Sequence, residues 1–233
     1  MMIDTGASNT FISKEWMKNN NIHYYPYTPN EINGCNVELY CSNVNMVIGN
    51  ICFPNKFIIV RPAIGWIRNS FYGCLGMDIL RELPFTLNLI NREKSHWGAF
   101  SVDDTFKKLE CDFDCYGLPH AYITLRENKC YCVLFDTAAH KSMLSSKIVT
   151  NIERDVNSKP VPYSDTLGHK ELYYESKRMI ININRDIILP NFKPVITSGS
   201  EMILGIDAFD RFIIHHDKQN MFYVLDSSFH SNT

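Results

Sequence analysis

A short motif built around an aspartate occurs twice in the chain, and it restricts the fold more than any other feature. Asp4-Thr5-Gly6-Ala7 is followed by Leu75-Gly76-Met77-Asp78, and Asp136-Thr137-Ala138-Ala139 is followed by Leu204-Gly205-Ile206-Asp207. The two Asp-to-Gly intervals are nearly equal in length. The repeat therefore predicts one structural unit present twice, with two aspartate-bearing turns that face each other.

The length of the chain agrees with two such units. Its 233 residues are enough for two units of ordinary domain size, each with its own core. The segment from residue 91 to 117 has mixed charge and contains Gly98, which is typical of a connection between units. We place the boundary near residue 100, with a first unit at 1–100 and a second at 101–233.

Hydrophobic periodicity predicts a mostly β fold with short helices. Apolar residues alternate after the turn pair Asn33-Gly34, and similar short runs recur along the whole chain. Helical spacing is clearest in two stretches, 76–83 and 205–212, each of which begins at the glycine of a Leu-Gly pair. His215 and His216 lie near a predicted turn, and we expect them at the surface.

Composition excludes several classes of partner. The net charge of −2 gives no reason to expect nucleic acid, and apolar runs such as 57–60 are too short for a membrane-spanning helix. The eight cysteines do not repeat between the units, so we expect free thiols. A zinc site would need a second pair of ligands beside Cys111, Cys115 and His120, and no pair with suitable spacing occurs. We therefore predict no metal and no cofactor. Two units in one chain predict a monomer. The compartment is not indicated.

Two facing aspartates are suited to hydrolysis of peptide bonds. Carboxyls that are close together share one proton, so that one takes a proton from water while the other donates one to the substrate carbonyl. Asp4 and Asp136 are the candidates. A threonine after each aspartate can bond to the opposite turn, and the small residues Gly6 and Ala138 let the turns approach.

These motifs resemble the signature of the retropepsin-like and pepsin-like aspartic proteases, Asp-Thr/Ser-Gly followed downstream by a hydrophobic-Gly pair. The resemblance covers nearly the whole chain and implies a bilobal acid protease fold, with two retropepsin-type units in one chain. It implies Asp4 and Asp136 as the catalytic pair, Thr5 and Thr137 as a mutual grip, and an extended peptide or protein substrate. It also implies flap hairpins, whose tips we place at Gly34 and Gly168.

The chain departs from this family pattern in two places. Ala138 stands where the family has glycine, and its methyl is costly only if the residue needs positive φ. Strand-like sequence precedes Asp136 from residue 118, whereas three residues precede Asp4. We therefore expect the first lobe to lack its N-terminal hairpin, as in a fragment. Two alternatives remain open: a catalytically inactive peptide-binding or scaffold protein, and a homodimer that uses only the second unit.

Residues near the two aspartates also predict the pH range of the reaction. Neither Ala7 nor Ala139 has a hydroxyl that favours an ionised carboxylate, so we expect an optimum nearer about pH 5 to 6 than pH 2. Asp78 and Asp207 begin the two predicted helices, where a carboxylate is favoured by free N–H groups. We therefore expect them to be structural.

Overall fold

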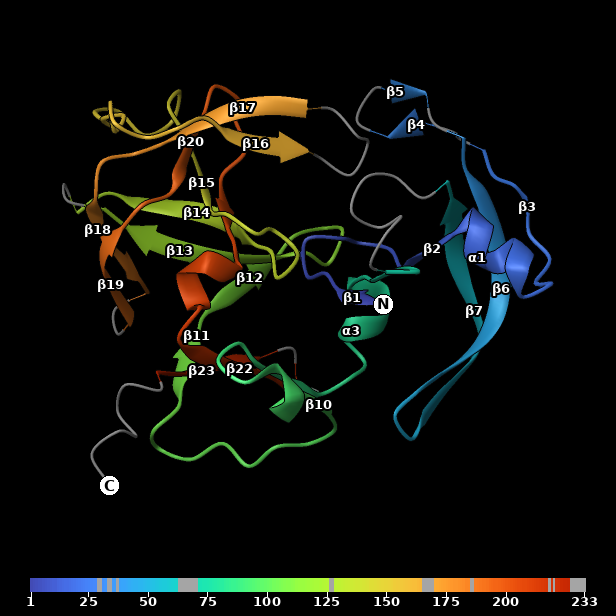
Figure 1. The fold of residues 1–233 in the computed structure, drawn as a ribbon. Helices are drawn as coiled ribbons and strands as arrows, with labels where there is room; N and C mark the ends of the chain where they lie inside the picture. The colour runs from blue at the N-terminus through green and yellow to red at the C-terminus, as the bar shows by residue number, and fades with distance from the viewer. Residues whose placement is uncertain are drawn as a thin grey trace.

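The computed structural model describes residues 1–28, 31–32, 35–36, 38–62, 71–125, 128–164, 170–184, 187–217, 219 and 221–226. Flap-tip candidates Gly34 and Gly168 lie outside these residues. The protein is mostly β, as the periodicity predicts (Figure 1). No helix in the described part of the chain is both long and apolar enough to cross a membrane.

The strands are short, and most are connected by turns. Those before residue 100 are β1 (Met2–Ile3), β2 (Phe11–Ser13), β3 (Tyr25–Pro26), β4 (Glu31–Ile32), β5 (Cys35–Asn36), β6 (Tyr40–Ile48), β7 (Ile51–Arg61), β8 (Gly73–Leu75), β9 (Phe85–Asn88) and β10 (His96–Trp97). Those after it are β11 (Lys107–Leu109), β12 (Cys111–Phe113), β13 (Pro119–Thr124), β14 (Cys130–Phe135), β15 (Met143–Ser145), β16 (Val161–Ser164), β17 (Lys170–Glu175), β18 (Met179–Ile183), β19 (Ile187–Phe192), β20 (Val195–Thr197), β21 (Ile203–Leu204), β22 (Phe212–His216) and β23 (Phe222–Asp226).

Helices are short. They are α1 (Lys14–Asn19), α3 (Met77–Leu80) and the 3-10 turns η1 (Arg92–Lys94) and η2 (Ile206–Phe209). Helix α1 begins after Ser13, whose hydroxyl accepts a hydrogen bond from the Trp16 amide at 3.0 Å. Both stretches with helical spacing are helical only at their start, immediately after Gly76 and Gly205.

Two sheets have the same arrangement of strands around the two aspartates. The first has the order β1-β8-β2-β7-β6-β3, and β1 and β2 are parallel to β8 and β7 respectively. The second contains β14, β21, β15 and β20, in which β14 is parallel to β21 and β15 is parallel to β20. In both sheets the middle pair, β2–β8 or β15–β21, is antiparallel.

The strand registers match residue by residue. Cys74 lies opposite both Met2 and Phe11, and in the second sheet Ile203 lies opposite both Leu134 and Met143. The two sequence repeats therefore have the same strand pairing around their aspartates. One difference concerns the strands next to them: β14 pairs with β13 as well as β21, whereas β8 is the only partner of β1 among the described strands.

A third sheet takes strands from both sides of residue 100. Its order is β10-β9-β22-β23-β11, so that β9 of the first unit pairs with β22 near the C-terminus. Phe85, Phe135, Phe209 and Phe222 are fully buried and belong to one hydrophobic cluster that includes residues of both units. Burial of these aromatic side chains helps to hold the units together.

The surface position expected for His215 and His216 is wrong. Both side chains are buried in β22, where His216 stacks on Phe85 with ring centroids 5.0 Å apart. Nδ1 of His215 lies 3.1 Å from Oγ1 of Thr86 in the neighbouring strand. The prediction assumed that residues close to a turn are exposed. Here neighbouring strands and aromatic rings cover the end of β22, so both histidines are buried although a turn follows at residue 217.

The buried His215 makes stability depend on pH. Desolvation by burial lowers the pKa of His215 below 6.5, with His96 acting in the same direction and Asp217 against it. The unfolded chain therefore binds more protons than the folded protein below about pH 6.5, and stability decreases as pH falls through that range. We expect His215→Asn to flatten this slope in urea unfolding between pH 5 and 7. An unchanged slope would contradict the assignment.

Candidate active site

The two motif aspartates lie side by side although 131 residues separate them in sequence. Asp4 follows β1 and its amide donates to the carbonyl of Leu75 at 3.0 Å; Asp136 follows β14 and donates to Leu204 at 3.1 Å. The Asp4 and Asp136 side chains are hydrogen-bonded to each other. Asp4 is buried and Asp136 is partly buried. The structure thus brings the two predicted carboxyls into direct contact.

Reciprocal threonine hydrogen bonds join the two turns. The Thr5 hydroxyl donates to the Phe135 carbonyl at 2.7 Å and accepts from the Thr137 amide at 3.0 Å. The Thr137 hydroxyl donates to the Ile3 carbonyl at 2.9 Å and accepts from the Thr5 amide at 3.1 Å. Each hydroxyl therefore satisfies one donor and one acceptor of the opposite turn. This reciprocal set fixes the distance between Asp4 and Asp136.

Each unit has a second aspartate, Asp78 or Asp207, whose carboxylate supports the segment that follows the turn. Oδ1 of Asp78 accepts from both the amide and the hydroxyl of Thr10 at 2.8 Å. Oδ1 of Asp207 accepts from the amide of Ser142 at 2.8 Å and from its hydroxyl at 2.6 Å. The same hydroxyls accept from the amides of Gly76 and Gly205. Asp78 and Asp207 thus act within the fold, as expected for structural residues.

Gly6 and Ala138 occupy equivalent positions but tolerate a side chain differently. A Cβ on Gly6 would lie 2.5 Å from Cγ of Asp136, so the carboxyl of Asp136 occupies the space of that missing side chain. Ala138 has no positive φ, and its methyl therefore adds no backbone strain. The first turn requires glycine at position 6 because the Asp136 carboxyl lies too close for a side chain. The second turn does not require glycine at position 138.

This difference predicts opposite effects of two small substitutions. Gly6→Ala forces the Asp136 carboxyl to move, and we expect any hydrolytic activity that depends on the pair to fall by about 100-fold, because catalysis is sensitive to displacements near 1 Å. Ala138→Gly leaves the geometry unchanged, and we expect activity within about threefold of the parent. Steady-state kinetics on folded protein measures both. Equal effects of the two substitutions would contradict the packing argument.

The two carboxyls have unequal surroundings. Burial, followed by the charge of Asp136, raises the pKa of Asp4 to about 7. Burial also raises the pKa of Asp136, but Oδ1 of Asp136 accepts the amides of Ala138 at 2.8 Å and Ala139 at 3.1 Å, which act in the opposite direction. Hydrogen bonds to a carboxylate favour its ionised form. The two amides therefore favour ionisation of Asp136 over ionisation of Asp4.

The flap-tip candidates are flanked by paired strands. β4 and β5 are antiparallel around residues 33–34, and β16 and β17 are antiparallel around residues 165–169. Both hairpins lie on the same side of the molecule, at the top of the view, one over each group of strands (Figure 1). The placement of Gly34 and Gly168 at the tips remains a prediction.

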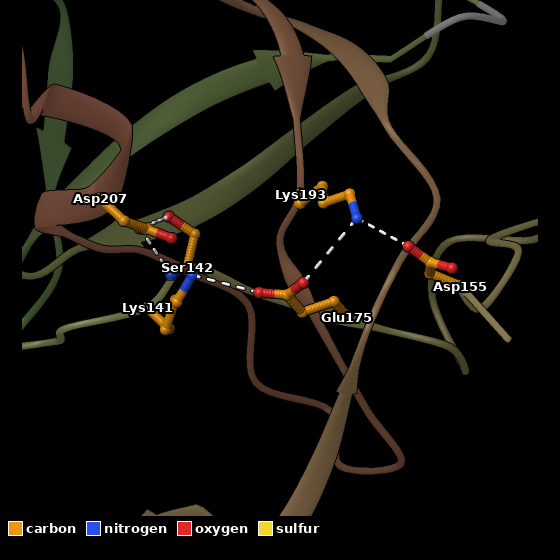
Figure 2. A network of polar contacts seen from close by, with 6 residues as sticks. All are labelled: Lys141, Ser142, Asp155, Glu175, Lys193 and Asp207. Atoms are coloured by element: carbon orange, nitrogen blue, oxygen red, sulfur yellow. Dashed lines mark hydrogen bonds and ion pairs between the residues drawn. The ribbon is translucent and has the colours of Figure 1, made fainter. Parts of the chain in front are cut away.

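The structure contains an ion-pair network beside the second turn that the sequence did not predict. Lys141 pairs with Glu175 of β17 at 3.3 Å, and Lys193 lies 2.6 Å from Asp155 and 4.0 Å from Glu175 (Figure 2). The network connects the segment after Asp136 to the strand that leads from residues 165–169. No local pattern could have revealed it, because its members are far apart in sequence and meet only when β17 and β20 pair.

No group of three or more His, Cys, Asp or Glu side chains in the described ranges is arranged to hold a metal ion. Seven of the cysteines are free thiols: Cys41, Cys52, Cys74, Cys111, Cys115, Cys130 and Cys132. In comparisons with known proteins, no protein-family model matches the chain and no curated protein matches its sequence. The assignment of a function therefore rests on the residues and geometry of the site.

Proposed function

We propose that the protein is an aspartic endopeptidase with two retropepsin-type units in one chain and a bilobal, pepsin-like or retropepsin-like fold. One observation carries the proposal: Asp4 and Asp136 are in contact, and the reciprocal bonds of Thr5 and Thr137 hold them there. Such an arrangement is costly, because it desolvates two carboxyl groups that are too close for both to be ionised. A fold rarely maintains it without a chemical use for the shared proton.

The unequal surroundings assign a role to each carboxyl. Asp136, ionised and supported by two backbone amides, takes a proton from a water molecule, and the water oxygen bonds to the carbonyl carbon. Asp4 donates its proton to the carbonyl oxygen, which gives a neutral tetrahedral diol. Transfer of the proton from Asp136 to the amide nitrogen then breaks the C–N bond, and a hydroxyl of the diol returns its proton to Asp4 as the new carboxyl group forms. At the end of the cycle the pair again carries one proton.

Each of the two sheets has a small buried apolar cluster that packs against the alanine of its turn, Ala7 or Ala139. Phe11 and Cys74 form a small buried cluster in the first sheet, and Met143, Val195 and Ile203 form its equivalent in the second. A cavity of about 370 Å³ is lined by residues of β3, β6 and β7 together with Ile22 and His23, and neither aspartate lines it. We propose that an extended peptide substrate lies along the Asp4–Asp136 pair and beneath the two hairpins, because the pair is where the bond would be cleaved.

The decisive experiment is digestion of a denatured protein library from pH 3 to 8, with new termini identified by mass spectrometry. We expect cleavage between apolar residues, inhibited by a peptide that carries a hydroxyl in place of the scissile carbonyl. Activity should decline above about pH 7, where Asp4 loses its proton. Folded protein that binds the analogue but never cleaves would instead support the inactive peptide-binding alternative.

A further inference from the structure

The hairpin formed by β16 and β17 is joined at its base to the segment that follows the Asp136 turn. The ammonium group of Lys141 lies 3.3 Å from the carboxylate of Glu175, the last residue of β17 (Figure 2). The ammonium group of Lys193 lies 4.0 Å from the same carboxylate and 2.6 Å from that of Asp155, which precedes β16. The amide of Asp155 also donates to the carbonyl of Glu175 at 2.9 Å. The network therefore holds both limbs of the hairpin, and Glu175 is the residue that the two lysines share.

The backbone at Lys141 has a fixed position relative to the site. The next residue, Ser142, donates from its amide and its hydroxyl to Oδ1 of Asp207 at 2.8 and 2.6 Å. The same hydroxyl accepts from the amide of Gly205 at 2.9 Å. The strand before Gly205 is β21, which pairs with β14, and β14 leads directly into Asp136. The Lys141 ion pair is thus anchored to the same framework that holds Asp136.

The first unit has an uncharged residue at the equivalent position. Asn9 corresponds to Lys141, because each stands five residues after the aspartate of its motif. The side-chain amide of Asn9 donates to the hydroxyl of its neighbour Ser8 at 3.1 Å, and Asn9 is exposed. An amide cannot form the ion pair that an ammonium group forms. The charged connection from turn to hairpin therefore distinguishes the second unit from the first.

Partial burial separates this network from an ordinary surface ion pair. Its four side chains are between 19% and 35% exposed, whereas the side chains of the neighbouring pair Lys177–Glu153 are 61% and 68% exposed. Solvent and salt screen an exposed pair strongly, so that it contributes little, and they screen a partly buried pair less. Lys177 lies two residues after β17, at the base of the same hairpin, and provides a matched control.

We propose that Lys141 and Glu175 are positioning residues: their ion pair, reinforced by Lys193, fixes the β16–β17 hairpin relative to Asp136 and so keeps it ordered over a bound peptide. This inference rests on the proposed function. Neither side chain touches the reacting atoms, and both act through the hairpin. Because the hairpin covers the peptide and takes no part in proton transfer, loss of the ion pair weakens peptide binding more than it slows bond cleavage.

The first test separates KM from kcat, with an uncharged peptide as substrate. In Lys141→Met and in Glu175→Gln we expect KM to rise about threefold to tenfold while kcat stays within about twofold of the parent. Lys141→Arg keeps the charge and should restore KM. In the double variant the rise should be smaller than the product of the two single effects, because one shared interaction is lost. An unchanged KM in Lys141→Met, or an equal rise in Lys177→Met, overturns the proposal.

A second measurement does not depend on activity. Amide hydrogen–deuterium exchange reports local opening of β16 and β17, and we expect it to be about threefold to tenfold faster in Lys141→Met and unchanged in Lys177→Met. Equal exchange in the parent and in Lys141→Met refutes the inference whether or not peptides are cleaved. Faster exchange with an unchanged KM would limit the network to local stability and overturn its role in substrate binding. Absence of cleavage by the parent refutes the proposed function, and the exchange rates decide separately whether the ion pair positions the hairpin.

Discussion

Asp136→Asn should abolish peptide cleavage, with a loss of about 1000-fold or more in kcat/KM at every pH. An amide at this position cannot take a proton from water, although it fills the same space as the carboxyl. Asp4→Asn should have an effect of similar size, because the amide cannot donate a proton and return to its starting state. Single-turnover assays on the purified variants measure both losses.

The control for these variants is their stability. Both aspartates have a raised pKa in the folded protein, so ionisation of the pair opposes folding as pH rises from about 4 to 7. An asparagine removes this cost, and we expect both variants to unfold at the same or higher urea concentration than the parent at pH 7. Lost cleavage in a protein of undiminished stability identifies the pair as catalytic. Cleavage retained in Asp4→Asn alone would favour a homodimer built on the second unit.

Thr5→Val should destabilise the protein by about 2 to 4 kcal/mol. Valine has the shape of threonine but leaves the Phe135 carbonyl and the Thr137 amide without their hydrogen bonds in a buried site. Each unsatisfied buried group costs about 1 to 3 kcal/mol. Thr137→Val removes the equivalent bonds to Ile3 and Thr5 and should cost a similar amount. Urea unfolding measures both.

Thr5→Ser is the matched control, since it keeps the hydroxyl and loses one methyl group. We expect it to retain stability within about 1 kcal/mol of the parent. In the double variant with valine at both positions, the losses should be less than additive, because the two hydroxyls act on the same contact between turns. Full additivity would mean that each threonine stabilises only its own unit.

The sequence predicted best those features that depend on a local pattern of residues or on the internal repeat. Alternating apolar residues predicted the mostly β fold because burial of one face of a strand follows directly from that pattern. The conformation of Ala138 could not be predicted, because φ at a turn depends on where the neighbouring strands lead the chain. The same limit explains the error at His215 and His216, which are buried by residues from β9 and β23.

The sequence by itself determined the candidate residues for the proposed chemistry. The two Asp-Thr turns, the Leu-Gly pairs and the mostly β character follow from the repeat and from the pattern of apolar residues. Only the tertiary structure decided how the two carboxyls differ. The amides on Asp136 come from its own turn, but the contact between Asp4 and Asp136 joins residues that 131 others separate in sequence, and burial by the rest of the fold sets the surroundings of both carboxyls. The free energy of a buried charge depends on every group around it, and those groups become neighbours only in the folded chain.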